Sequence, residues 1–250
     1  RIARTSLRPT PAPTDMKRDR IAGLDVVLAG AGMAGSPMVV LLHGFGAPGE
    51  DLVALQRVLA VPRETQFVFP AAPIALAMMP GVDSRAWWNI DMLRLQNAID
   101  RGELNDLSAQ VPDGLDEARE KIDAMLGELE KKFSPRALVL GGFSQGAMLA
   151  VDVALRTGRR FDALVVLSGT LLARDVWLPK MSALAGTSIF QSHGSHDPIL
   201  PFALAEQLEK AFVAGGADVT FVPFRGAHEI PGPVVDRLGA FLDRRLKVAS

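Results

Sequence analysis

The feature that most constrains the fold of this chain is a serine held between two glycines at a change of pattern. The residues Gly142-Phe143-Ser144-Gln145-Gly146 follow the apolar run 137–140, which is short enough for a buried strand. The run 147–155 comes after them and contains neither Gly nor Pro, as a helix requires. The glycines leave room where a Cβ would clash in a very tight turn. We therefore expect a strand-to-helix turn that presents Ser144 as a nucleophile, and an ordinary glycine-rich turn is the alternative.

Apolar runs of strand length alternate with segments of helical period over most of the chain. Strands are expected at residues 24–29, 38–42, 66–69, 137–140, 163–167, 188–191 and 219–224. Helices are expected at residues 50–60, 113–133, 147–155, 202–214 and 234–246. This alternation predicts an α/β fold whose mostly parallel central sheet is covered by helices on both faces. The short glycine-rich link 30–37 predicts that the first two strands pair antiparallel, and Asp113 is expected to cap the helix that follows it.

The domain boundaries follow from length and local composition. Residues 1–20 carry three prolines among basic residues without an apolar period, so we expect a flexible tail or a surface strap there. Residues 21–250 are expected to form one domain, since 250 residues suffice for a single α/β core. A long loop insert without a steady period is expected at about residues 76–112.

Composition excludes several classes of function. The 27 basic and 28 acidic residues give a net charge of −1, which offers no electrostatic case for binding nucleic acid. The chain has no cysteine, so disulfides and thiolate chemistry are excluded, and no apolar run is long enough to span a membrane. We expect a cytoplasmic protein. A removed signal peptide stays open as an alternative, because the sequence begins at Arg1 rather than Met.

A nucleophilic serine needs a base to take its proton and an acid to orient that base. Asp197 follows the expected strand 188–191, and His228 follows the expected strand 219–224. Both lie after Ser144 in the chain order serine, acid, histidine. We therefore predict Ser144, Asp197 and His228 as a catalytic triad. The alternatives are a turn-forming aspartate before Pro198 and a solvated loop histidine.

The negative oxygen of a tetrahedral intermediate needs backbone N–H donors. The N–H of Gln145, directly after the serine, is one candidate. The second is the N–H of Phe45 in His43-Gly44-Phe45-Gly46, which follows the expected strand 38–42. His43 precedes the serine in the chain, so we expect it to shape this loop rather than act as the base.

The chain resembles the phospholipase/carboxylesterase family of α/β-hydrolases, which includes acyl-protein thioesterases. The matching stretches lie in order between Val40 and Ile230. They are 42–46 (LHGFG), 69–73 (FPAAP), 85–88 (RAWW), 141–146 (GGFSQG), 167–169 (LSG), 193–201 (HGSHDPILP) and 226–230 (GAHEI). The resemblance implies an α/β-hydrolase fold with its nucleophile elbow at Ser144, the triad and oxyanion donors named above, and no metal or organic cofactor. The sequence departs from the thioesterases at Ala47, where they tend to carry Asp, and at Ala147, where they usually carry Gly.

The insert is rich in side chains that make adaptable apolar walls. A pocket for an acyl or aryl group is therefore one interpretation, and packing under the loop as a satellite core is the other. The candidate pocket residues are Met78, Trp87, Trp88, Leu171 and Trp177. His193 and His196 have a spacing found in metal sites, but no third ligand is evident and we expect no metal there.

We therefore expect a serine carboxylesterase that acts on small to medium acyl or aryl esters, and on thioesters as well. The partner is a small-molecule ester, and the protein is expected to be a monomer or a homodimer. The alternatives are an acyl-protein thioesterase or lysophospholipase, which would need a groove for a long chain, and a binding protein on a hydrolase scaffold.

Overall fold

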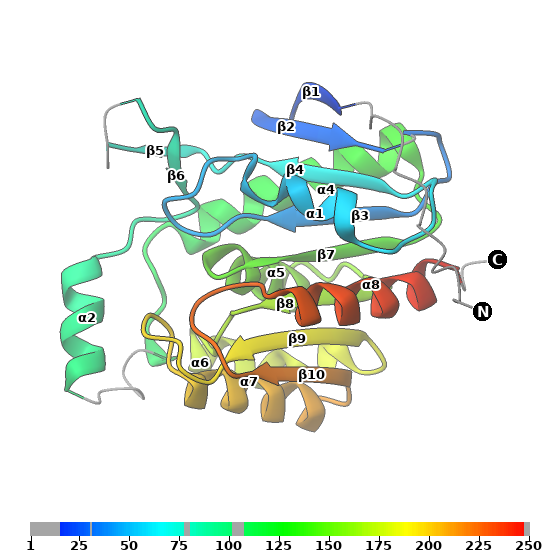
Figure 1. The fold of residues 1–250 in the computed structure, drawn as a ribbon. Coiled ribbons are helices and arrows are strands. Elements are labelled where there is room, and N and C mark those ends of the chain that lie inside the picture. Colours follow the sequence, from blue (N-terminus) through cyan, green and yellow to red (C-terminus); the bar gives the residue numbers. More distant parts are fainter. Residues whose placement is uncertain (1–15, 31, 78–80, 102–107, 248–250) are drawn as a thin grey trace, which may run out of the picture.

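An eight-stranded sheet forms the centre of the molecule (Figure 1). The computed structural model describes residues 16–30, 32–77, 81–101 and 108–247. The strands lie in the order β1 (Met16–Ile21), β2 (Leu24–Ala29), β4 (Gln66–Pro70), β3 (Met38–Leu42), β7 (Leu138–Phe143), β8 (Ala163–Leu167), β9 (Ser188–Gly194) and β10 (Asp218–Phe224). Neighbouring strands from β4 to β10 are parallel, and β2 is antiparallel to both of its neighbours.

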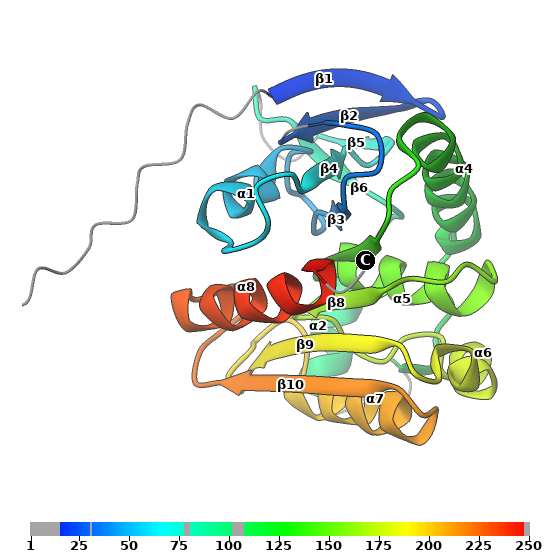
Figure 2. The same ribbon diagram turned by 90° about the vertical axis from the view of Figure 1, so that its right-hand side faces the viewer.

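Helices cover both faces of this sheet, and Figure 2 shows the two layers edge-on. One layer contains α4 (Leu115–Phe133), α5 (Gln145–Arg156), α6 (Arg174–Trp177), the 3₁₀ segment η2 (Leu178–Leu184) and α7 (Phe202–Ala214). The other contains the 3₁₀ turn η1 (Asp51–Ala54), α1 (Leu55–Val58) and α8 (Gly232–Lys247). The side chains of β3 alternate between the two apolar cores, as the period of a strand requires. The mostly parallel α/β sheet predicted from the sequence is confirmed.

The expected strands and helices are present, with shifts at their ends. Helix α7 has the predicted limits, whereas β9 continues three residues beyond the expected end at Gln191. Helix α4 begins at Leu115 after Gly114, which has a positive φ of 91° and provides no side-chain cap. The expectation that Asp113 caps this helix was therefore wrong. None of the helices in the described part of the chain has the length and apolar character needed to cross a membrane.

The expected tail at residues 1–20 must be corrected at its end. Residues 1–15 lie outside the described residues, but Met16–Ile21 form β1 and pair antiparallel with β2. Charged side chains at positions 17–20 gave no apolar period. An edge strand can be held by backbone hydrogen bonds to a single neighbour without an apolar period of its own. Exposed charged side chains on such a strand disfavour pairing with another molecule.

The expected pairing of the first two predicted strands was also wrong. β2 and β3 do not pair, because β4 lies between them and pairs antiparallel with β2 and parallel with β3. The link at residues 30–37 therefore spans a neighbouring strand instead of closing a hairpin.

The insert is more regular than expected. It contains the end of β5 (Ile74–Leu76), the strand β6 (Ser84–Ala86) that pairs antiparallel with β5, and helix α2 (Met92–Asp100). Helix α2 stands apart from the two helix layers, past the edge at which the parallel strands end (Figure 1).

Candidate active site

Four strand ends bring the predicted site residues to one edge of the sheet. β3, β7, β9 and β10 all run in the same direction, so the segments after them emerge at the same edge. His43 follows β3, Ser144 follows β7, Asp197 lies three residues after β9 and His228 four residues after β10. Residues far apart in the sequence are thereby gathered beside the start of α5.

The turn after β7 is strained at the serine itself. Ser144 has φ 54° and ψ −118° and directly precedes helix α5. Non-glycine residues rarely adopt a positive φ, and such strain is found mainly at functional sites. A Cβ at Gly146 would lie 2.1 Å from the carbonyl oxygen of Leu42, and one at Gly142 would lie 2.5 Å from the same oxygen. Glycine at both positions lets the turn lie directly against the end of β3.

The predicted acid and base are in contact. Nδ1 of His228 lies 2.6 Å from Oδ2 of Asp197, whose side chain is fully buried. The other carboxylate oxygen of Asp197 accepts hydrogen bonds from the backbone N–H groups of Ile199 and Leu200, both at 2.9 Å. The acid is thus held by its own loop, and its second oxygen is left to orient the imidazole.

The same carboxylate has a partner that the sequence analysis missed. Nε2 of His193 lies 2.9 Å from the Leu200 carbonyl oxygen and 3.3 Å from Oδ2 of Asp197. Burial by itself would raise the pKa of Asp197. The hydrogen bonds from His193, His228 and the Leu200 N–H outweigh burial and hold this pKa well below its usual value. Asp197 is therefore an anion beside His228. The signal for this contact was the position of His193 four residues before Asp197, whereas His193 had been considered only together with His196 as a metal spacing.

The predicted base lies against the turn that carries the serine. The rings of His228 and Phe143 have centroids 4.7 Å apart, and Phe143 directly precedes Ser144. Within the described residues the Ser144 hydroxyl makes no hydrogen bond to His228. Catalytic hydrogen bonds are often long in a protein without substrate and shorten when substrate binds.

The loop after β3 touches the serine turn. A Cβ at Gly44 would lie 3.4 Å from Cβ of Ser144, so the two backbones approach closely. The side chain of His43 is buried, its Nδ1–H donates to the Gly44 carbonyl oxygen at 2.8 Å and its Nε2 accepts from the Ala72 N–H at 3.0 Å. Burial lowers the pKa of His43, which favours the neutral ring these bonds require. Both ring nitrogens are occupied, so the geometry suits the structural role expected for His43.

The two predicted oxyanion donors are the backbone N–H groups of Phe45 and Gln145. Neither N–H has a hydrogen-bond partner among the residues that the structure describes. Gln145 is the first residue of α5, where backbone N–H groups point outward and the helix dipole favours negative charge. This arrangement can receive a developing oxyanion next to Ser144.

Four of the candidate pocket residues are buried side chains: Trp87, Trp88, Leu171 and Trp177. Trp87 and Trp88 are 1% and 2% exposed, and both belong to the main apolar core together with Leu171. Trp177 is fully buried, and its indole N–H donates to Oδ1 of Asp152 on α5 at 2.8 Å. These side chains lie in the main apolar core rather than in a satellite core under the loop. Met78 lies outside the described residues.

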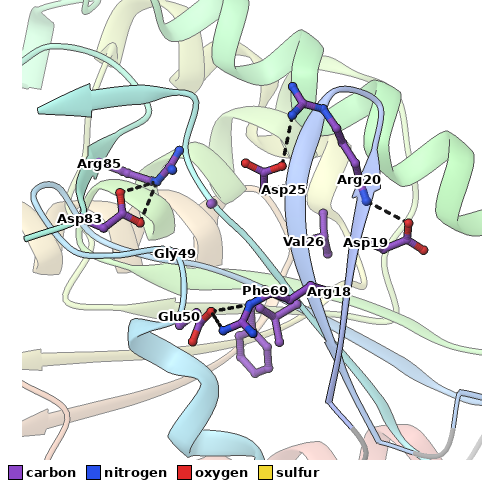
Figure 3. A pocket seen from close by; sticks show the side chains of 12 residues that line it. Arg18, Asp19, Arg20, Asp25, Val26, Gly49, Glu50, Phe69, Asp83 and Arg85 are labelled. Carbon is purple, nitrogen blue, oxygen red and sulfur yellow. Dashed lines mark hydrogen bonds and ion pairs between the residues drawn. The ribbon is translucent and has the colours of Figure 1, made fainter.

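Two open cavities lie away from the triad. One, of about 440 Å³, is bounded by β1, β2 and the loop before η1, and Figure 3 shows the charged side chains around it. Its three arginines are each paired, Arg18 with Glu50, Arg20 with Asp25 and Arg85 with Asp83, so none of the described residues that line it is a free cation. The second, of about 450 Å³, is lined by one side of α2 and Gln110.

Comparison with known proteins identifies relatives that cover most of the chain. A model described as phospholipase/carboxylesterase matches residues 26–246. The acyl-protein thioesterase 1 of Emericella nidulans is 28% identical over 216 residues, which cover 82% of this chain and 89% of that protein. The acyl-protein thioesterase 1 of Saccharomyces cerevisiae is 26% identical over 220 residues, covering 83% of this chain and 92% of its relative.

Solved structures of the same fold include esterases. The crystal structure of esterase PE8 superposes with a TM-score of 0.70 at 25% identity, covering 93% of this chain and 99% of that one. The Bacillus cereus carboxylesterase superposes with a TM-score of 0.67 at 20% identity, covering 89% and 94% of the two chains. The second likeness concerns the fold alone.

Proposed function

The chain belongs to the phospholipase/carboxylesterase family and is a serine hydrolase of the carboxylesterase type, and from this premise we propose that Ser144, Asp197 and His228 form its catalytic triad. The observation that carries the proposal is the 2.6 Å contact between His228 and the buried Asp197 carboxylate, beside the strained turn at Ser144. No other histidine in the described residues combines a carboxylate partner with a position against this turn.

The proposed reaction proceeds through an acyl-enzyme. Ser144 Oγ attacks the acyl carbonyl carbon while Nε2 of His228 takes the hydroxyl proton, and Asp197 stabilises the imidazolium that forms. The N–H groups of Phe45 and Gln145 hold the tetrahedral oxyanion. His228 then protonates the leaving alcohol as the C–O bond breaks. Water, deprotonated by the same histidine, attacks the acyl carbon, and His228 returns this proton to Ser144 Oγ as the acyl C–Oγ bond breaks and the acid leaves.

A fluorophosphonate probe tests this assignment. Parent protein should be labelled, and Ser144→Ala should lose both the label and at least about 1,000-fold of kcat while unfolding at an unchanged temperature. The control is Ser195→Ala, whose exposed hydroxyl lies 3.1 Å from Nδ1 of His196 and which should keep the label. Labelling of the Ser144→Ala protein, or activity above about a hundredth of the parent, would contradict the triad.

Thioester hydrolysis is the second candidate, and it is favoured by the acyl-protein thioesterases among the relatives. The same triad can cleave an S-acyl bond, since the thiolate leaves more readily than an alkoxide. Measuring kcat/KM for an oxygen ester and a thioester with the same acyl group separates the two activities. A ratio that favours the thioester by about 100-fold would make thioesterase the primary activity.

We propose small and medium acyl groups because Ala47 and Ala147 depart from the residues that acyl-protein thioesterases tend to carry at these positions. A series of p-nitrophenyl esters from short to long chains measures this preference directly. The proposal also includes a cytoplasmic location and a monomer or homodimer. A net charge of −1 supports the absence of nucleic-acid partners.

A further inference from the structure

The segment from Ser84 to Trp88 lies between the two turns that carry the proposed oxyanion donors. On one side it bonds to the loop after β3. The Gly46 N–H donates to the Arg85 carbonyl oxygen at 2.8 Å, and the Arg85 N–H donates to the Ala47 carbonyl oxygen at 3.1 Å. These two bonds hold the two residues that directly follow Phe45.

On its other side the segment is bonded to the side chain of Gln145, which is fully buried. The Gln145 Oε1 accepts from the Trp87 N–H at 2.9 Å, and its Nε2 donates to the Trp88 carbonyl oxygen at 2.8 Å. A backbone N–H can meet only the amide oxygen and a carbonyl only the amide NH₂, so the orientation of this amide is determined. The first residue of α5 is thereby bonded through its side chain to the segment.

The indole of Trp87 completes the connection. Its Nε1–H donates to the His43 carbonyl oxygen at 2.9 Å, and its ring centroid lies 5.4 Å from that of His43. His43 is in turn held by the Ala72 N–H at 3.0 Å. Trp87 therefore donates its backbone N–H to Gln145 and its indole N–H to the loop after β3.

We infer that the segment from Ser84 to Trp88 sets the distance between the two oxyanion donors, with the Trp87 indole and the Gln145 amide as its positioning groups. Oxyanion stabilisation depends on donors that are already in place when charge develops. A displacement of about 1 Å can cost about 100-fold in rate. The inference deepens the proposed function and rests on it, because it takes Phe45 and Gln145 as the donors.

The direct test is Trp87→Phe, which removes the indole N–H and keeps an aromatic ring in the core. The measurements are kcat and KM per active site, with active sites counted by the fluorophosphonate probe, and Ki for an aryl trifluoromethyl ketone. This inhibitor forms a tetrahedral oxyanion on a nucleophilic serine, so its Ki reports the oxyanion donors. We expect kcat/KM to fall about 10- to 100-fold, Ki to rise by the same factor and KM to change less than about twofold.

Trp177→Phe is the matched control. Trp177 is also fully buried and also donates its indole N–H to an oxygen at 2.8 Å, but that oxygen belongs to Asp152 on α5. This variant should lower the melting temperature and leave Ki per active site within about twofold of the parent. A purely structural role for Trp87 would give the same result as Trp177→Phe, and that result would overturn the inference.

Gln145→Met provides a second, independent variant. It keeps the length of the side chain and removes both hydrogen bonds that the side-chain amide makes to Trp87 and Trp88. It should raise Ki as Trp87→Phe does, and the double variant should show less than the product of the two effects, since both act on one connection. If either variant fails to fold, the other decides. An unchanged Ki in a folded variant would overturn the inference. Failure of the parent to react with the probe would instead overturn the proposed function itself.

Discussion

Helix α5 has a buried polar network at each end, and the two networks are built from different chemistry. At its start, Gln145 bonds to the backbone of Trp87 and Trp88 through a neutral amide. Further along, the fully buried carboxylate of Asp152 accepts the Trp177 indole N–H at 2.8 Å and lies 3.3 Å from Arg119 and 3.5 Å from Arg156. The first network is neutral and the second is ionic.

The two networks differ in charge because the first lies beside the proposed oxyanion site and the second joins helices in the core. Neutral hydrogen bonds orient a turn without adding charge, so they leave the field at the oxyanion site to the backbone donors. The ionic network joins α4, α5 and α6 through one carboxylate, at the cost of removing a charge from water. We therefore expect damage at the start of α5 to appear in activity, and damage around Asp152 to appear in stability.

The largest expected effect is at the start of the helix. In Gly146→Ala the new Cβ would lie 2.1 Å from the Leu42 carbonyl oxygen and 2.5 Å from that of His43. Backbone must move to relieve both contacts, so we expect a loss of about 4 kcal/mol in unfolding free energy and at least about 100-fold in kcat of the folded fraction. Urea unfolding and probe-titrated kinetics measure these separately. An unchanged kcat in a destabilised Gly146→Ala protein would contradict the expectation that damage at the start of α5 lowers activity.

The next largest effect is expected at Asp152, where two substitutions separate the loss of the charge from the loss of the hydrogen-bond acceptor. Asp152→Ala should cost about 3 kcal/mol, because it removes the acceptor of the Trp177 indole and one counter-charge of Arg119 and Arg156. Asp152→Asn keeps an oxygen for the indole and should cost less. Both variants should retain kcat per active site within about threefold at a temperature where they are folded. A large fall in kcat for either would show that this network also positions the serine turn.

The smallest effect concerns His43, whose carbonyl oxygen accepts the Trp87 indole N–H and whose side chain is buried. Burial lowers the pKa of His43 below its ordinary value of 6.5, so below that value the unfolded chain binds more protons than the folded one. Stability from this group is therefore complete above about pH 6.5 and is lost as the pH falls, by at most about 1.4 kcal/mol per pH unit. His43→Gln should flatten the curve of unfolding free energy between about pH 8 and 5.5.

The comparison for this prediction is parent against His43→Gln at each pH. The difference in slope should persist at about 0.5 M salt, because burial rather than long-range charge causes it. Parallel curves would mean that His43 is protonated as readily in the folded protein as in the unfolded chain.

The turn at Ser144 and the order of the main strands and helices could be predicted from the amino-acid sequence. Both depend on local patterns: apolar runs of strand length, a helix period and glycines where a Cβ would clash, as at Gly142 and Gly146. The positions of Asp197 and His228 after parallel strands also followed from order alone, because parallel strands end at one edge of a sheet.

Which segments pack against one another became visible in the folded chain alone. β4 lies between β2 and β3, charged β1 joins the sheet through its backbone, and the tryptophans of the insert and of α6 are buried in the core instead of lining an open pocket. The Trp87 indole reaches the His43 carbonyl oxygen across loops that are separate in sequence. A local pattern fixes the backbone conformation and the polarity of a side chain. The neighbour that this side chain contacts depends on how distant segments pack, and no local pattern records that.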